Sequence, residues 1–297
     1  MLLNHRIPVS YIINKVRRDF FYVLIVSLSV LLITEKYKHF LPEMPLTIPT
    51  FIGTAISILL SFKLNQSYDR WWEARKVWGA IVNDSRSLTI QLQTLVSSGN
   101  ETIIRKIVKR QIAWCYSLGQ GLRGLDTLEN LDRFIDDKET EEIKLQVNKP
   151  LALLALHGKD IRQLRENGHL DILSQLQLDD TLVRLCDAQG KAERIKNTIF
   201  PVTYRIFLHS IIYLFVVTLS ISLKDVAGFF EIPLLLLIST AFFLLEKSAA
   251  HMQDPFENRP TDTPVTAIAK TIEINLKQLI GENEIPDNSP TENFYLL

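Results

Sequence analysis

Four apolar runs separated by polar segments dominate the hydrophobic pattern of the chain. They cover Phe20 to Thr34, Pro45 to Phe62, Ile206 to Leu223 and Val226 to Leu245. Each uncharged run is at or below the ~18 to 20 residues that a clear membrane-spanning helix requires. Flanking aromatic and basic side chains can extend a short span. The pattern therefore predicts four transmembrane helices in two hairpins, with a soluble helical bundle as the alternative.

The second run carries no charge and predicts a helix that is apolar on all sides. Residues four apart lie nearly on one line of such a helix, which divides it into a small-residue stripe, a bulky apolar stripe and a stripe that widens from a hydroxyl to a ring. In that order, the stripes are Gly53, Ser57 and Ser61; Ile56, Leu60 and Leu64; and Thr54, Ile58 and Phe62. Small residues let another helix approach closely. We expect the bulky stripe to face lipid and the third stripe to face a pore, whereas a buried helix would pack on every side.

Basic residues alternate between the ends of the runs. They gather before the first run, after the second, before the third and after the fourth: Lys15, Arg17 and Arg18; Lys63, Arg70, Arg75 and Lys76; Lys191, Arg194, Lys196 and Arg205; and Lys247. The loops of the two hairpins hold only Lys36, Lys38 and Lys224. Because basic residues favour the cytoplasmic side, this alternation predicts a multi-pass protein with both termini and the middle segment in the cytoplasm.

The sequence predicts helices in the polar segments. Predicted helices cover 67–96, 101–122, 150–166, 170–197 and, in the tail, 265–279. The sequence shows no alternating strand patterns and no Asn-Gly hairpin turn between strands. We therefore predict an all-α membrane protein built as one unit over 1–297. Its parts are a transmembrane hairpin at 20–64, a large helical cytosolic region at 65–203, a second hairpin at 204–247 and a cytosolic C-terminal segment at 248–297.

Composition and motifs exclude several classes of function. The 33 basic and 33 acidic residues balance, so no global positive field is available to hold nucleic acid. The two cysteines, Cys115 and Cys186, are too few for a disulfide framework, and we expect both to be reduced core thiols. The sequence has no Walker loop, G-x-S-x-G or H-E-x-x-H motif, so we expect no enzyme, metal site or cofactor. His209 lies inside a predicted span, where we expect a hydrogen bond between helices.

An aromatic patch follows the uncharged run. Tyr68, Trp71, Trp72 and Trp78 lie among charged residues just after the predicted span. Tyrosine and tryptophan are enriched where a membrane meets water, so we predict that these four side chains anchor the protein at the interface.

Several segments resemble the bestrophin family, specifically its bacterial members, over nearly the whole chain. The segments that carry the resemblance are Ser61-Phe62, Ser67 to Gly79, Leu164 to Gly168, Ala192 to Thr198 with Pro201 and Tyr204, and Asp254 to Phe256. The resemblance implies a homopentameric ion channel around a central pore in the cell inner membrane. It implies a neck that looks like Thr54, Ile58 and Phe62, and a cytosolic constriction that looks like Leu173, or Ile172 if the register shifts by one residue.

The chain departs from the family pattern at two places. Thr54 stands where the family usually has a bulky apolar residue, which implies a wider or wetter outer neck. The animal members carry an acidic run that binds Ca²⁺ after their Asn-Pro-Phe segment, and this chain has Glu257-Asn-Arg-Pro-Thr-Asp262 there instead. Calcium gating through that segment is therefore not expected.

The resemblance predicts partners of three kinds: identical copies in a homopentamer, the lipid bilayer, and small monovalent ions, with cations favoured over chloride. A non-conducting membrane scaffold that holds a partner through its cytosolic helices is the alternative function. A membrane-embedded enzyme ranks last, because the sequence shows no cluster of histidines or carboxylates near a span.

Overall fold

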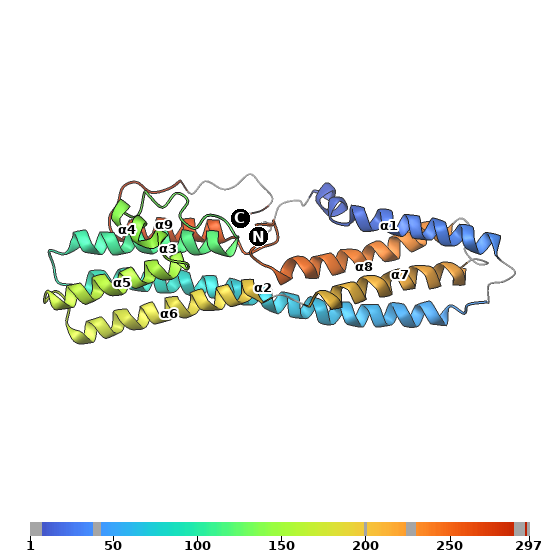
Figure 1. Ribbon diagram of the computed structural model, residues 1–297, viewed down its shortest axis with the longest axis horizontal. Helices are drawn as coiled ribbons and strands as arrows, with labels where there is room; N and C mark the ends of the chain where they lie inside the picture. The colour runs from blue at the N-terminus through green and yellow to red at the C-terminus, as the bar shows by residue number, and fades with distance from the viewer. Residues whose placement is uncertain (1–7, 38–42, 199–200, 224–229, 288–294, 296–297) are drawn as a thin grey trace. The chain divides into compact units, whose positions relative to one another are not determined.

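The computed structural model describes residues 8–37, 43–198, 201–223, 230–287 and 295, and the elements among them are α-helices (Figure 1). The helices are α1 (Val9–Lys36), α2 (Thr47–Leu95), α3 (Glu101–Leu122), α4 (Asp137–Lys144), α5 (Lys149–Glu166), α6 (Ile172–Asn197), α7 (Val202–Leu223), α8 (Glu231–Gln253) and α9 (Val265–Leu279). The all-α prediction is confirmed. Two residues used for the orientation prediction, Lys38 and Lys224, lie outside the described residues, as does part of the predicted fourth run.

Helices α3 and α9 have the bounds predicted from the sequence, whereas α2 and α4 differ from the prediction. Helix α2 joins the uncharged run and the predicted helix 67–96 into one element of 49 residues, since no proline or glycine interrupts the polar residues between them. Helix α4 was not predicted. Its signal is a capping pattern, in which the Asp136 side chain accepts a hydrogen bond of 2.8 Å from the backbone N–H of Glu139.

The chain divides into two compact units. The first unit contains Trp71–Thr198 and Asp254–Leu297, and the second unit contains His5–Arg70 and Ile199–Gln253. Helix α2 contributes residues to both units. The cytosolic region at 65–203 and the transmembrane hairpin at 204–247 stay predictions, because the division into two units does not show where the membrane lies.

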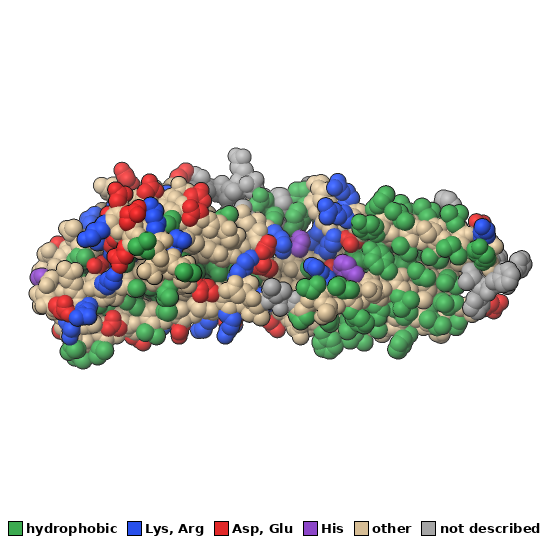
Figure 2. Space-filling model, in the orientation of Figure 1, with side chains coloured by type: hydrophobic (Ala, Val, Ile, Leu, Met, Phe, Trp, Pro, Cys, Tyr) green, Lys and Arg blue, Asp and Glu red, His purple; other side chains and the backbone are tan. Residues whose placement is uncertain are grey.

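The second unit is built from apolar helices. Helix α1 packs on α7 and α8, which also pack on each other. Figure 2 shows hydrophobic side chains crowding the visible surface over α1, α7 and α8. Within the described residues, three helices are long and apolar enough to cross a membrane: α2, α7 and α8. Helix α1 holds the first predicted run but is not among these three, so a fourth span stays a prediction.

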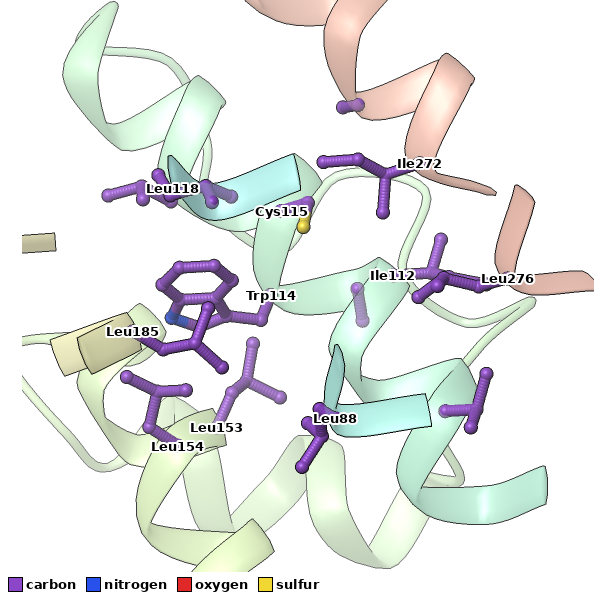
Figure 3. Packing of buried hydrophobic residues seen from close by; sticks show 14 of the residues in the cluster. Leu88, Ile112, Trp114, Cys115, Leu118, Leu153, Leu154, Leu185, Ile272 and Leu276 are labelled. Atoms are coloured by element: carbon purple, nitrogen blue, oxygen red, sulfur yellow. The ribbon is translucent and has the colours of Figure 1, made fainter. Parts of the chain in front are cut away.

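The first unit has a conventional helical core. Trp114 of α3 is fully buried among side chains from several helices, shown in Figure 3, and its indole N–H donates to Gln189 Oε1 at 3.1 Å. Cys115 is buried beside it, as expected. Cys186 is exposed, so its prediction as a core thiol was wrong. Helix α6 buries one face and exposes the other. Leu185 lies on the buried face, and Cys186, the next residue, points about 100° away from it.

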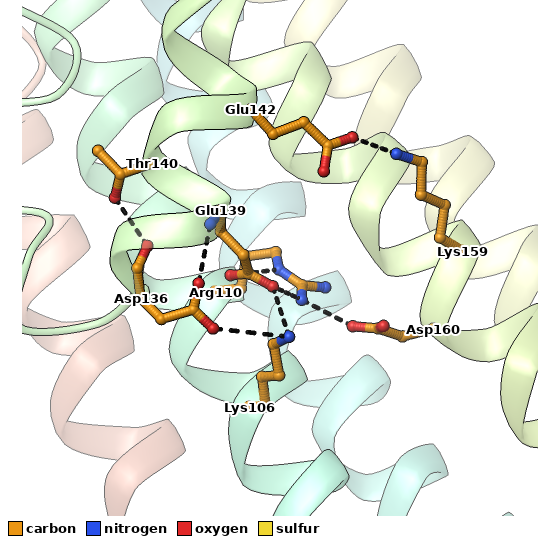
Figure 4. A network of polar contacts seen from close by, with 8 residues as sticks. All are labelled: Lys106, Arg110, Asp136, Glu139, Thr140, Glu142, Lys159 and Asp160. Atoms are coloured by element: carbon orange, nitrogen blue, oxygen red, sulfur yellow. Dashed lines mark hydrogen bonds and ion pairs between the residues drawn. The ribbon is translucent and has the colours of Figure 1, made fainter.

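A polar network in the first unit fastens α4 and α5 to α3 (Figure 4). The Arg110 guanidinium, almost fully buried, contacts the Glu139 carboxylate and lies 2.7 Å from Asp160 Oδ2. Burial alone would lower the pKa of Arg110, but the two carboxylates raise it above its ordinary value. Lys106 adds a contact of 2.9 Å to Glu139. The network therefore serves the fold, because its charges are paired with one another.

His157 provides a pH-dependent stability test for the first unit. It is fully buried, and burial together with the nearby Arg110 charge lowers its pKa well below the ordinary 6.5. The folded protein keeps this ring neutral, whereas the unfolded chain gains a proton below pH 6.5. Stability should therefore fall as the pH drops below that value, by at most about 1.4 kcal/mol per pH unit from this residue.

We expect the substitution His157→Leu to remove this part of the acid sensitivity. The measurement is the thermal unfolding midpoint of the first unit's helices in the full chain, followed between neutral and mildly acidic pH. A variant whose midpoint declines with acid as steeply as the wild type would show that His157 is not responsible.

Candidate functional site: the α2 stripe and the buried charges behind it

The three predicted neck residues lie on one exposed face of α2. Ile58 is 53% exposed and Phe62 is 62% exposed within the single chain, and Thr54 is also exposed. The Thr54 hydroxyl donates to the Thr50 carbonyl at 2.9 Å, so its hydrogen bond is made within the helix. The face is therefore mostly apolar, and none of the described residues of its unit covers it.

The stripe of bulky residues behaves differently from the prediction. Ile56 and Leu60 are buried in the second unit against residues of α7 and α8, so their expected contact with lipid was wrong. The physical reason is that an apolar helix buries its largest branched side chains where other helices offer matching surface. Helix α2 is therefore anchored on one side and exposed on the other.

The small-residue stripe gives one close contact. A β-carbon at Gly53 would lie 3.2 Å from the Phe215 ring of α7, so only glycine leaves this ring undisturbed. Ser57 and Ser61 are exposed instead. Further along, the Tyr204 hydroxyl of α7 donates to the Leu59 carbonyl at 2.9 Å. These contacts set α2 directly against α7.

A charged cluster lies directly behind Phe62. The Lys63 ammonium is 2.6 Å from Glu246 Oε1 of α8, and the two side chains are 0% and 2% exposed. The other carboxylate oxygen of Glu246 lies 3.3 Å from Nε2 of His209 on α7. The hydrogen bond expected at His209 is not formed, because its Nε2 atom only approaches the carboxylate and has no hydrogen-bond partner among the described residues. Sequence reasoning treated Lys63 as a flanking charge and missed its partner, although Glu246 stands out as an acidic residue at the end of the last apolar run.

Two more polar contacts lie in the same unit. Lys247 of α8 pairs with Asp19 of α1, and Lys15 of α1 donates to Ser248 Oγ at 3.2 Å. Lys63 and Lys247 were both counted as flanking cytoplasmic charges, and both are engaged with acidic partners inside the helical unit.

The predicted cytosolic constriction lies at the start of α6 in the first unit. Leu173 and Ile172 are 70% and 60% exposed. Asp171 caps the helix by accepting from the Leu173 and Ser174 backbone N–H groups at 2.8 and 3.0 Å. Its hydrogen bonds with the Ser174 hydroxyl and these backbone groups lower the pKa of the Asp171 carboxyl. A carboxylate therefore lies next to both candidate constriction residues.

The four aromatic residues of the predicted membrane anchor differ in their exposure. Tyr68 and Trp72 are exposed, and Trp71 is half-buried with its indole N–H donating to the Thr261 carbonyl at 3.0 Å. Trp78 is fully buried in the core of the first unit, so its assignment to the interface is corrected. Trp78 lies on the side of α2 that packs inward, because Ala74 and Ile81, one turn before and after it, are also fully buried.

The segment after α8, where calcium gating is not expected, carries Asp254, Glu257 and Asp262. Lys196 of α6 lies 3.0 Å from Asp254 Oδ2 and 2.7 Å from Glu257 Oε1, so one ammonium bridges these two carboxylates. Burial raises the pKa of Asp262 to about 6. Its Oδ2 atom accepts a hydrogen bond from the Arg259 backbone N–H. In the part of the chain that the structure describes, no group of three His, Cys, Asp or Glu side chains could hold a metal.

Comparison with known proteins gives a consistent result. The family model described as "Bacterial/Fungal Bestrophin protein" matches residues 3–278. A voltage-dependent anion channel-forming protein of Ralstonia nicotianae is 32% identical over 267 residues, which cover 88% of this chain and 86% of that protein. The voltage-dependent anion channel-forming protein YneE of Escherichia coli K12 is 28% identical, covering 96% of this chain and 93% of YneE.

Solved structures agree with the sequence relatives. The crystal structure of a bacterial bestrophin homolog from Klebsiella pneumoniae matches with a TM-score of 0.84 and 28% identity, covering 90% of this chain and 99% of that one.

The long apolar helices and the charges paired among them define a helical membrane protein. The chain belongs to the bacterial and fungal bestrophin family, as its resemblance to that family predicted.

Proposed function

We propose that the protein is a homopentameric ion channel whose neck is formed by Thr54, Ile58 and Phe62 of five copies. The observation that carries this proposal is the exposed apolar face of α2, on a helix whose opposite side is buried. The names of the relatives, which describe anion channel-forming proteins, support the same class of function.

A ring of apolar side chains gates by dewetting. An ion in such a constriction loses water and gains no replacement ligand, so the passage stays closed until the side chains turn or the helices separate. Phe62 is the widest of the three residues and would be the tightest level of the neck. Thr54 would leave the other end of the stripe wider.

Exposed apolar side chains on the first unit support assembly with other copies. They lie on α6 and on the part of α2 in that unit: Ile172, Leu173, Leu176, Val183 and Ile90. Large exposed apolar surfaces mark interaction sites in proteins. We propose that neighbouring copies cover part of this surface, while Leu173 or Ile172 forms a second constriction.

We further propose four spans, with α1 completing the set, in the cell inner membrane with both termini in the cytoplasm. Helix α1 packs on α7 and α8, as a fourth span would. The exposed aromatic residues Tyr68 and Trp72, with Trp71, would then lie near the cytoplasmic interface.

The proposal also concerns the charge of the permeating ion. The relatives are named for anions, whereas Asp171 would place five carboxylates around the second constriction. Acidic rings favour cations, so we propose monovalent cations.

Ion flux through purified protein in liposomes, with sodium and chloride gradients set separately, tests the proposed function. A reversal potential that follows the sodium gradient supports a cation channel, and one that follows chloride overturns the ion sign but not the channel. Absence of flux from protein of confirmed pentameric mass would favour the membrane scaffold.

A further inference from the structure

The cluster of Lys63, Glu246 and His209 joins three helices at the level of the proposed neck. Lys63 comes from α2, His209 from α7 and Glu246 from α8, and the Lys63–Glu246 contact has almost no exposed surface. Removing two charges from water is costly, and ionisable residues among membrane helices are usually kept for a function. This cluster therefore calls for a role beyond packing.

The position of Lys63 links the cluster to the neck. Lys63 follows Phe62 directly, and successive residues of an α-helix point about 100° apart. Because Glu246 holds the Lys63 side chain on the α8 side, the rotation of α2 at this level is fixed. Phe62 is thereby directed to the exposed face.

We propose that Lys63, Glu246 and His209 are positioning residues that hold Phe62 in the neck, and that protonation of His209 weakens this hold. The inference rests on the proposed channel function. It adds a control of the neck by pH.

The contacts of Glu246 supply the mechanism. Its Oε1 accepts from Lys63 and its Oε2 faces Nε2 of His209. This Nε2 atom makes no hydrogen bond to a described residue, so the contact is an approach of the imidazole to the carboxylate across two helices. A proton gained from water makes the ring a cation. One carboxylate now faces two cations, which repel each other in surroundings of low dielectric constant, and the attraction that holds Lys63 is weakened.

The His209 ring lies among aromatic side chains of α7 and α8. The side chain is 31% exposed in the single chain. The Phe243 ring of α8 meets its ring edge-on at 5.4 Å, and Tyr213 of α7 packs on Phe243. Two charged pairs lie in the same unit, Lys247 with Asp19 and Lys63 with Glu246, and α1 and α7 also carry Arg17, Arg18 and Arg205.

Flux in liposomes, compared between about pH 7.5 and about pH 5.5, tests the inference. We expect wild-type flux to rise several-fold as the pH falls. His209→Gln keeps a donor and His209→Phe keeps a ring, and neither titrates, so both variants should give a flat profile. His169→Gln, which changes an exposed histidine of the first unit, should keep the wild-type profile.

Three outcomes decide the matter. A pH response that persists in either His209 variant, or wild-type flux that is constant or falls with acid, would overturn the positioning role of His209. Increased flux of Phe62→Ala at neutral pH, measured in the same liposomes, would show that the channel itself stands in that case. No flux from any variant would instead reject the proposed function.

Discussion

Replacing Phe62 with alanine should raise ion flux about tenfold or more. The substitution removes a ring from each of five copies at the tightest level of the proposed neck, which lowers the dewetting barrier. A reduction of that barrier by ~1.4 kcal/mol is sufficient for a tenfold increase in rate. The measurement is flux per assembled pentamer in liposomes at neutral pH.

Phe207→Ala is the matched control for this prediction. Phe207 is an exposed phenylalanine of α7 in the same unit, similar to Phe62 in type and exposure, and it is not part of the α2 stripe. Its flux should equal that of the wild type. Equal flux in Phe62→Ala and Phe207→Ala would remove Phe62 from the neck.

Replacing Lys63 with methionine should destabilise the protein by about 3–5 kcal/mol, because the buried Glu246 carboxylate then loses its main partner. The effect is measured as a lower thermal midpoint of the detergent-extracted protein, followed by size-exclusion chromatography. Lys76→Met is the control. Lys76 pairs with Glu73 at 2.6 Å on the surface, with side chains 57% and 39% exposed, and such pairs contribute about 1 kcal/mol or less.

The double substitution Lys63→Met with Glu246→Leu completes this test. Removing both charges leaves no unpaired ion in the core, so most of the lost stability should return. If the double variant is less stable than Lys63→Met by the full cost of a second substitution, the two residues do not act as a pair.

Much of the fold could be predicted from the sequence because helices respond to local periodicity. The amphipathic helices α3 and α9 show their buried faces in sequence, and their bounds agree with prediction. Helix α4 is short and polar, so only its capping residues Asp136 and Glu139 mark it. The two predicted helices join into α2 because no proline or glycine lies between them. A prediction based on hydrophobic runs alone ends the first helix where the polar residues begin.

The candidate site was harder to predict, because its decisive contacts join residues far apart in sequence. The stripe of Thr54, Ile58 and Phe62 is visible as a local spacing. The side of α2 that packs inward is a tertiary property, and it reversed the expectation for Ile56 and Leu60. The same holds for Trp78, where aromatic character predicted an interface and packing placed the ring in a core. The Lys63–Glu246 pair spans 183 positions and leaves no local pattern.

The orientation of Phe62 in the assembled protein is the most direct test of the central claim. It can be measured by electron cryo-microscopy of the full-length protein in lipid nanodiscs. The account predicts a ring of five copies in which Thr54, Ile58 and Phe62 point to the central axis, with Phe62 at the narrowest level. An assembly without a lumen along α2, or one in which Phe62 faces lipid, would contradict it.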